Sequence, residues 1–186
     1  MMEPPLDLLK KYWSYSCFLP HQQEIIGSVL DGRDTLAVMA TGGGKSLCYQ
    51  LPAVFFGGLT LVISPLISLM KDQVDDLNAR GIPAAAWNSS LEYRDRARIE
   101  ADLKDGNLRL LFISPEKCMQ QHFLESLRLM RIRLIAIDEA HCISEWGHNF
   151  RPEYRQLAQI RKCFPEVPLM ALTATAIPEG RRDIVR

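Results

Sequence analysis

The chain has 186 residues, of which 47% are apolar and 24% charged, a composition typical of one globular domain. Its 22 basic residues balance its 22 acidic ones, so contact with nucleic acid would need a local basic patch and not an overall positive field. No apolar run approaches the roughly 20 residues that span a bilayer, and the N-terminus shows no secretory signal, so we expect neither a membrane-spanning nor a secreted protein.

The N-terminal part divides into two stretches. Residues 1–19 are rich in aromatic side chains, and we expect them to form an irregular lead-in segment. Pro20 then starts a helical stretch over residues 21–30, with apolar residues on one side, and Asp31-Gly32 ends it. The domain itself is expected over residues 20–186.

A glycine-rich turn, M-A-T-G-G-G-K-S at residues 39–46, joins a short apolar run at 35–38 to a helix-forming segment at 47–56. A strand that turns through glycines into a helix directs its free N–H groups and the helix dipole at one place, where anions bind. The pattern is that of a P-loop, although Met39 stands where the strict motif has glycine. The alternative is a chance Gly-Lys-Ser turn. The flanking strand and helix favour the P-loop.

The residues of this turn have separate predicted roles. The glycines let the backbone approach phosphate oxygens that a Cβ atom would block. Lys45 would place a positive charge at the terminal phosphates, and the Ser46 hydroxyl would ligate Mg²⁺. We therefore expect ATP and Mg²⁺ as cofactors. The expected nucleotide-binding residues of the turn are Thr41, Gly42, Gly43, Gly44, Lys45 and Ser46.

Apolar, β-rich runs and helical patterns alternate along the rest of the chain. The runs lie at residues 35–40, 59–64, 84–87, 108–114, 134–137 and 169–173. Helical spacing follows at 66–77, Ser89 and Glu92 have the pattern of a capping box for a helix that runs to Lys104, and a further helix is expected over 154–164. Continuous apolar runs are typical of strands buried on both faces. The sequence therefore predicts a three-layer α/β domain with a mostly parallel central sheet.

Two motifs follow apolar runs, and ligands of such sheets gather at the carboxyl ends of the strands. Asp138-Glu139 follows the run at 134–137, where Asp138 would hold Mg²⁺ and Glu139 would polarise the attacking water as general base. An acidic helix N-terminus is the alternative for this pair. Thr173 and Thr175 end the last run, and their hydroxyls would link the acidic motif to whatever binds nearby.

The cysteines give no sign of a metal site. The chain has five, with no C-x-x-C pair, so neither a zinc site nor a disulfide framework is supported. Most of them are expected to be small core residues in a reducing cytoplasm. They are Cys17, Cys48, Cys118, Cys142 and Cys163.

The chain resembles RecQ-family DNA helicases in four segments. These are M-A-T-G-G-G-K-S-L-C-Y-Q from residue 39, V-I-S-P-L-I-S-L-M-K-D-Q-V from 62, I-D-E-A-H-C-I-S-E-W-G-H-N-F-R-P-E-Y from 137 and M-A-L-T-A-T-A from 170. The resemblance covers the chain from about residue 18 to its end and implies the first of two RecA-like lobes. It implies the ATP-binding lobe of a 3′-to-5′ DNA helicase, a cytoplasmic protein that associates with the nucleoid if bacterial.

The resemblance also implies what the chain lacks. The family's second RecA-like lobe, with its arginine finger, and its zinc-binding and winged-helix regions have no counterpart here, so we expect little turnover by this chain alone. The second lobe and single-stranded or partly duplex DNA are the implied partners. Two other functions stay open from the sequence, a nucleotide- or DNA-binding module without turnover and a small P-loop kinase. The D-E-A-H segment suits hydrolysis better than a kinase.

Residue roles follow from the matching positions. Gln22 corresponds to the glutamine that reads adenine, although Leu19 stands where the family usually has arginine. His141 would link the γ-phosphate to the DNA-contacting segment. The implied catalytic residues are Lys45, Asp138, Glu139 and His141, and the implied coupling residues are Thr173 and Thr175.

Two segments are implied to contact DNA. Ser64, Ser68 and Lys71 would donate to phosphates at a strand end and a helix N-terminus. A capped surface helix explains Lys71 equally well. The family's aromatic-rich loop would form a platform for unpaired bases, and the alternative for it is a hydrophobic plug over the sheet edge. Its residues are Trp146, His148, Phe150, Arg151 and Tyr154.

Overall fold

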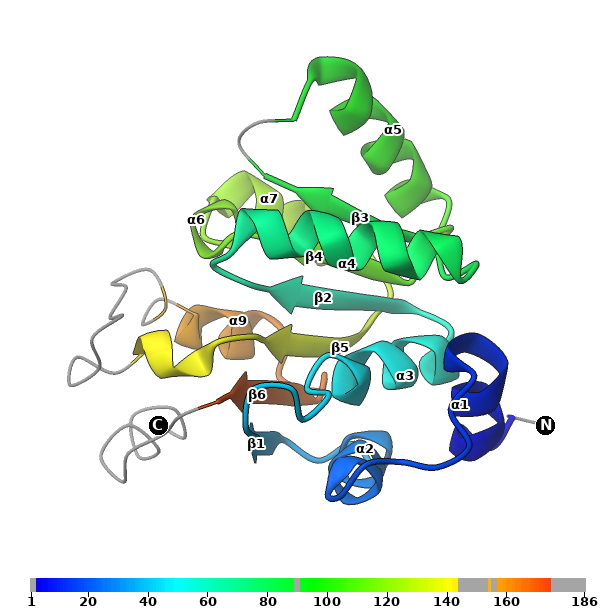
Figure 1. Ribbon diagram of the computed structural model, residues 1–186. Helices are drawn as coiled ribbons and strands as arrows, with labels where there is room; N and C mark the ends of the chain where they lie inside the picture. Colours follow the sequence, from blue (N-terminus) through cyan, green and yellow to red (C-terminus); the bar gives the residue numbers. More distant parts are fainter. Residues whose placement is uncertain (1–2, 89–90, 144–153, 155–156, 175–186) are drawn as a thin grey trace.

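The computed structural model describes residues 3–88, 91–143, 154 and 157–174 (Figure 1). Within them, six strands form one sheet in the order β1-β6-β5-β2-β4-β3, and every pairing is parallel. The strands are β1 (Thr35–Val38), β2 (Leu59–Ile63), β3 (Ala84–Trp87), β4 (Leu110–Ile113), β5 (Ile132–Ile137) and β6 (Leu169–Thr173). The prediction of a mostly parallel sheet is confirmed.

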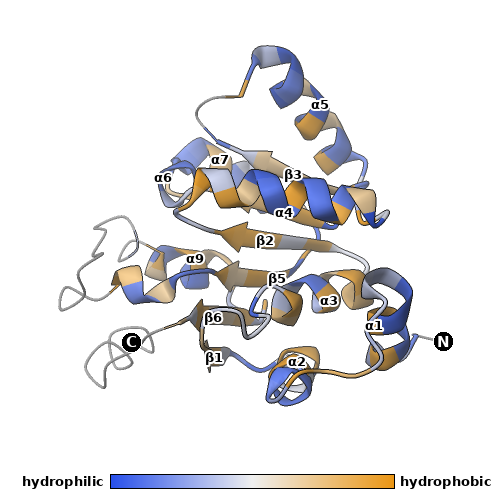
Figure 2. Cartoon of the chain, viewed as in Figure 1, coloured by the Kyte–Doolittle hydropathy of each residue, from blue (hydrophilic) through white to orange (hydrophobic). Residues whose placement is uncertain are grey.

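Helices cover both faces of the sheet, as predicted. On one side lie α1 (Pro5–Trp13), α2 (Gln22–Leu30), α3 (Leu47–Phe56) and α4 (Ile67–Ala79). On the other lie α5 (Tyr93–Lys104), α6 (Pro115–Cys118), α7 (Gln121–Leu127) and α9 (Ala158–Cys163). Neighbouring strand residues serve opposite layers, since Leu110 packs into the first core and Leu111 into the second. Figure 2 shows the hydrophobic residues concentrated in the strands and the inner helix faces.

The prediction of an irregular segment over residues 1–19 is wrong, because α1 occupies its middle. Pro5 stands at the first helical position, where a missing N–H costs nothing, and Asp7 lies in the positively polarised first turn. Leu9 and Trp13 are buried in the core beside α3. This short amphipathic helix, which belongs to the domain, was not predicted because the segment was taken for an aromatic-rich irregular stretch.

Other helix boundaries also differ from expectation. The N-cap of α5 is Glu92, with no side-chain cap, so the predicted capping box is wrong, and Ser89 lies outside the described residues. The short helices α6 and α7 were not predicted, because neither is long enough to show a helical period. Strand β5 begins two residues earlier than predicted, because the exposed Arg133 interrupts the apolar run.

Three of the five cysteines are core residues, as expected. Cys48, Cys118 and Cys142 are buried, whereas Cys17 is exposed and Cys163 is partly exposed. Burial raises the pKa of Cys48 and of Cys118 to about 12, so both are inert thiols. None of the helices described here is long and apolar enough to cross a membrane.

Candidate nucleotide-binding site

Three predicted motifs meet at one edge of the sheet, because the strands that carry them are neighbours. Val38 and Thr173 are register partners, and the Met39 N–H donates to the Thr173 carbonyl at 3.0 Å. Next to β6, β5 ends before Asp138, whose N–H donates to the Ile63 carbonyl at the end of β2 at 2.8 Å. The P-loop, the threonine motif and the acidic motif therefore leave the sheet side by side, and Figure 1 shows their strands adjacent.

The P-loop backbone has the shape that the glycines predict. Gly42 and Gly44 adopt φ values of +81° and +75°, a region that disfavours side chains. A Cβ atom on Gly43 would lie 3.0 Å from the Ala40 carbonyl oxygen, so the turn has no room for one. Lys45 folds back over this turn, with Nζ 3.5 Å from the Met39 carbonyl. The structure thus leaves bare backbone where phosphate oxygens would approach.

Met39 replaces the first motif glycine without disturbing the turn, because its side chain points into the core. It is 8% exposed, and its sulfur lies 3.8 Å from the Cys48 Sγ on α3. A thioether adapts well to irregular packing. The departure from the strict motif is therefore a packing substitution on the buried side of the loop.

Gln22 is buried against the P-loop. Its Nε2 donates to the Gly44 carbonyl at 3.1 Å, and its Oε1 accepts from the Leu19 N–H at 2.8 Å. A Cβ atom on Gly44 would collide with this amide. Glycine therefore suits this position both because of its positive φ and because Gln22 approaches it closely. Gln22 thus supports the P-loop, and one of its amide hydrogens is left for a further bond.

An open hollow of about 580 Å³ lies along the same segment. It lies beside the P-loop, since Leu19 borders both the hollow and Gly44. Its lining residues are Phe18, Leu19, Pro20, His21, Gln23 and Glu24.

Asp138 is a buried carboxyl group at the centre of the site. It is 5% exposed, and its Oδ1 accepts from the Glu139 N–H at 3.0 Å. Burial, with the nearby Glu139 charge, raises the pKa of Asp138 to about 6, while that hydrogen bond and the Lys45 charge act in the opposite direction. The Lys45 ammonium is therefore close enough to Asp138 to act on it.

Ser46 and Asp138 suit a cation that binds together with a nucleotide. Both act on Tyr49: burial raises the pKa of Tyr49 most, the Asp138 charge adds to the rise, and a hydrogen bond with Ser46 opposes it. The two predicted ligands therefore lie near one side chain. Across the described ranges, no three His, Cys, Asp or Glu side chains gather as a metal cluster. A hard cation with few protein ligands and several waters, such as Mg²⁺ on phosphates, fits this arrangement.

Glu139 has a strained backbone and a held side chain. Its φ of +51° is uncommon for a residue with a Cβ atom, and such outliers gather at functional sites. Its Oε2 lies 3.1 Å from the His141 Nδ1, and the same nitrogen lies 3.1 Å from the Thr173 Oγ1. His141 thus connects the end of β6 to Glu139, and the predicted contact between the threonine and acidic motifs is present.

Tyr154 behaves differently from a stacking aromatic. It is 1% exposed, and its hydroxyl donates to the Asp138 carbonyl at 3.0 Å, next to the strained Glu139. Tyr154 was predicted to belong to the aromatic-rich loop. Its helical spacing with the apolar Leu157 indicated a buried position instead, and the structure agrees with that spacing. The other predicted residues of that loop, and the second coupling threonine, lie outside the described residues. They are Trp146, His148, Phe150, Arg151 and Thr175.

The candidate DNA-contacting segment divides into a buried and an exposed part. Ser64 is 3% exposed at the end of β2, which disfavours the predicted contact with DNA phosphates. Ser68 and Lys71 are exposed in the first turns of α4. The N-cap of that helix, Leu66, offers no side-chain acceptor, so the first amides of α4 remain available to an anion.

The comparisons with known proteins agree with this geometry. A family model described as DEAD/DEAH box helicase matches residues 19–184. This chain belongs to the DEAD/DEAH box helicase family. The matched range includes the P-loop, the acidic motif and Gln22.

Two curated relatives of this DEAD/DEAH box protein carry the same name. The chain is 52% identical to ATP-dependent DNA helicase RecQ of Pasteurella multocida (strain Pm70) over 186 residues, all of this chain. It is 54% identical to ATP-dependent DNA helicase RecQ of Haemophilus influenzae (strain ATCC 51907 / DSM 11121 / KW20 / Rd) over 181 residues, 97% of this chain. The chain spans 29% of the length of each.

A solved structure supports the fold. The Mycobacterium smegmatis helicase Lhr superposes with a TM-score of 0.72 at 18% identity, covering 99% of this chain and 27% of that one. At this identity the likeness concerns the fold alone. The RecA-like prediction for the DEAD/DEAH box domain is thereby confirmed.

Proposed function

We propose that this chain is the ATP-binding lobe of a RecQ-type 3′-to-5′ DNA helicase. The observation that carries the proposal is the convergence of the P-loop, Asp138 and the His141–Thr173 contact at one sheet edge. The similarity to two ATP-dependent DNA helicases named RecQ supports the preference for DNA, and the 3′-to-5′ polarity is what the resemblance to that family implies. A second RecA-like lobe is the proposed partner. The proposed location is the cytoplasm, with association with the nucleoid if the protein is bacterial.

The P-loop residues bind and orient the phosphates. The backbone amides at the start of α3 and the bare glycine turn receive phosphate oxygens, and Lys45 turns from the Met39 carbonyl toward the terminal phosphates. Gln22 holds the turn from behind through Gly44 and offers its remaining amide hydrogen to adenine in the neighbouring hollow.

The residues after β5 and β6 prepare hydrolysis. Ser46 and Asp138 would hold Mg²⁺, which would neutralise charge at the phosphates when bound. Glu139 accepts the proton of the attacking water, and its contact with His141 fixes the carboxylate that does so. Thr173 anchors His141 in turn, so movement of β6 or of whatever binds beyond it changes the position of the base.

DNA is proposed to contact the exposed start of α4. Ser68, Lys71 and the free first amides of the helix offer donors to backbone phosphates. The solved helicase Lhr, which shares the fold, was bound to single-stranded DNA and AMP-PNP. The proposed base platform at residues 146–151 would add stacking.

Titrating Mg·ADP carrying a fluorescent label, with and without a single-stranded oligothymidine, tests this proposal. We expect DNA to tighten nucleotide binding about fivefold or more, the lower end of ordinary coupling between sites. Lys71→Ala should weaken DNA binding, because it removes a phosphate contact, and Lys104→Ala, an exposed lysine at the end of α5, should not.

Two results would contradict the helicase function. Nucleotide binding with no DNA binding at any tested salt concentration would favour a nucleotide-binding module. DNA binding that leaves nucleotide affinity unchanged would show two independent sites and remove the motor from the proposal.

A further inference from the structure

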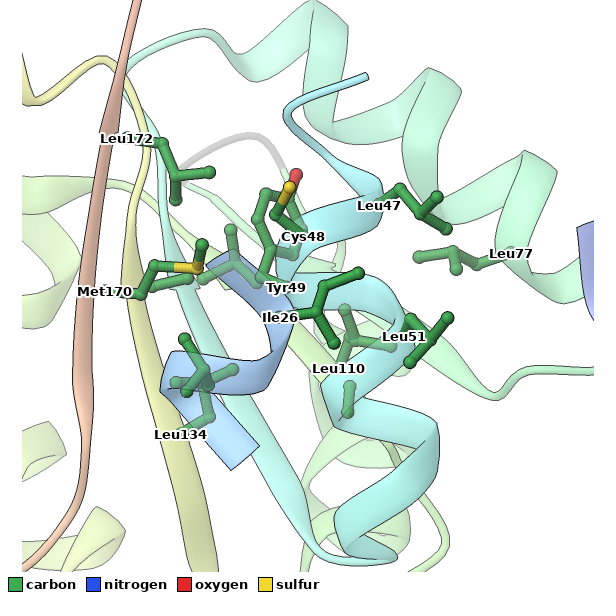
Figure 3. Packing of buried hydrophobic residues seen from close by; sticks show 14 of the residues in the cluster. Ile26, Leu47, Cys48, Tyr49, Leu51, Leu77, Leu110, Leu134, Met170 and Leu172 are labelled. Carbon is green, nitrogen blue, oxygen red and sulfur yellow. The ribbon is translucent and has the colours of Figure 1, made fainter. Parts of the chain in front are cut away.

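A partly buried polar contact joins α3, the helix that follows the P-loop, to α4. Tyr49 on α3 is fully buried, and its hydroxyl donates to the Gln73 Oε1 on α4 at 2.5 Å. Gln50, also buried on α3, donates to the same oxygen through Nε2 at 3.2 Å. Burying the polar groups of Tyr49 and Gln50 among apolar side chains is costly unless they find hydrogen-bond partners, and the partly buried Gln73 supplies one. Figure 3 shows Tyr49 among the core side chains, with Leu77 of α4 across from α3.

The two donors fix the orientation of the Gln73 amide. Because Oε1 accepts from both Tyr49 and Gln50, the amide nitrogen of Gln73 must point away from α3. Gln73 lies two residues after Lys71, on the partly buried side of α4. The contact therefore adds a directional restraint on the rotation of α4 about its axis, beside the burial of Met70 and Leu77 in the core.

The other end of the contact lies at the proposed cation site. The amides of Tyr49 and Gln50 both donate to the Ser46 carbonyl, at 3.2 and 3.0 Å, so the three residues form one helical turn. Burial raises the pKa of Tyr49, with Asp138 adding to the rise, so the hydroxyl remains a donor. A shift of Ser46 toward a bound cation would move this turn, and the Tyr49 hydroxyl would carry the shift to Gln73.

We propose that Tyr49 and Gln73 are positioning residues that couple nucleotide occupancy at Ser46 to the stability and orientation of α4. The link runs through the domain interior, separately from the His141–Thr173 contact at the sheet edge. It rests on the proposed function, since it needs Mg·nucleotide at the P-loop. It adds a route from the nucleotide to the helix that carries Ser68 and Lys71.

Hydrogen exchange of the full chain, with and without saturating Mg·ADP, tests the link directly. We expect Mg·ADP to slow exchange of the α4 amides about fivefold or more, an ordinary size for coupling between sites. In Tyr49→Phe and in Gln73→Met this slowing should fall below about twofold, and the double variant should lose no more than either single one. Tyr93→Phe, whose side chain is 85% exposed on α5, serves as the matched control.

The outcomes separate this link from the nucleotide site. Retained slowing over residues 42–47, with lost slowing over α4 in the variants, supports the proposal. Slowing over α4 that equals the parent's in both single variants overturns it, as does a parent in which Mg·ADP protects residues 42–47 alone. A parent with no protection by Mg·ADP anywhere overturns the nucleotide function itself. If Tyr49→Phe fails to fold, Gln73→Met, at a partly exposed position, decides the question.

Discussion

Replacing Lys45 by alanine will lower the affinity for Mg·ATP by about 100-fold or more. The ammonium is the positive charge that the P-loop presents, and in the structure it rests 3.5 Å from the Met39 carbonyl, ready to turn to a phosphate. A hydrogen bond to a charged group contributes about 1.5–3 kcal/mol, and the lysine would contact two phosphates. Isothermal titration calorimetry measures the loss.

The matched control for this experiment is Lys104→Ala. Lys104 is an exposed lysine in the last turn of α5, so its removal changes the net charge equally without touching the P-loop. Its affinity should equal that of the parent. Equal affinity in Lys45→Ala would show that nucleotide binds elsewhere on the chain.

ATP turnover by this chain alone should be about 10³–10⁵ times slower than in a chain that also carries a second lobe, the usual contribution of an arginine finger. Lys45 and Glu139 lie at the site, and within the described residues no arginine makes an observed contact with either of them. Arg161 is paired with Asp34 at the amino end of β1, the opposite edge of the sheet, and Arg80 is paired with Asp76 at the end of α4.

A phosphate-release assay on the two chains at saturating Mg·ATP measures this ratio. Glu139→Gln in the longer chain should remove most of the remaining turnover while leaving nucleotide affinity intact, because a general base acts in the chemical step and not in binding. A single lobe that turns over as fast as the longer chain would refute the need for an external arginine.

Much of the fold could be predicted because the strands are buried on both faces. Continuous apolar runs mark such strands clearly, so all six were found, and β3 and β6 had the predicted bounds. Arg133 hid the start of β5 because one outward-facing charge breaks an apolar run. Helix α1 was missed because its buried residues, among them Leu9 and Trp13, were read as an aromatic-rich loop.

The site was predicted as a set of motifs but not as a set of contacts. Glycine, lysine and acidic residues follow strand ends in sequence, and parallel strands bring their carboxyl ends together. Gln22, Tyr49 and Tyr154 donate to Gly44, Gln73 and Asp138, each 16 or more positions away, and no local spacing records such partners. The burial of Ser64 likewise follows from its position directly after the central strand β2, which lies between β5 and β4.

The most direct test is to locate the bound nucleotide and cation on the chain. We expect both to bind where β1, β6 and β5 end. At 21.1 kDa the chain suits backbone NMR, and Mn²⁺ in place of Mg²⁺ broadens resonances near the metal. With Mn·ADP, amides of residues 42–47 and 138–139 should broaden first and most. Broadening confined to surface carboxylates, such as Asp75 and Asp76 on α4, with residues 42–47 unaffected, would contradict the proposed site.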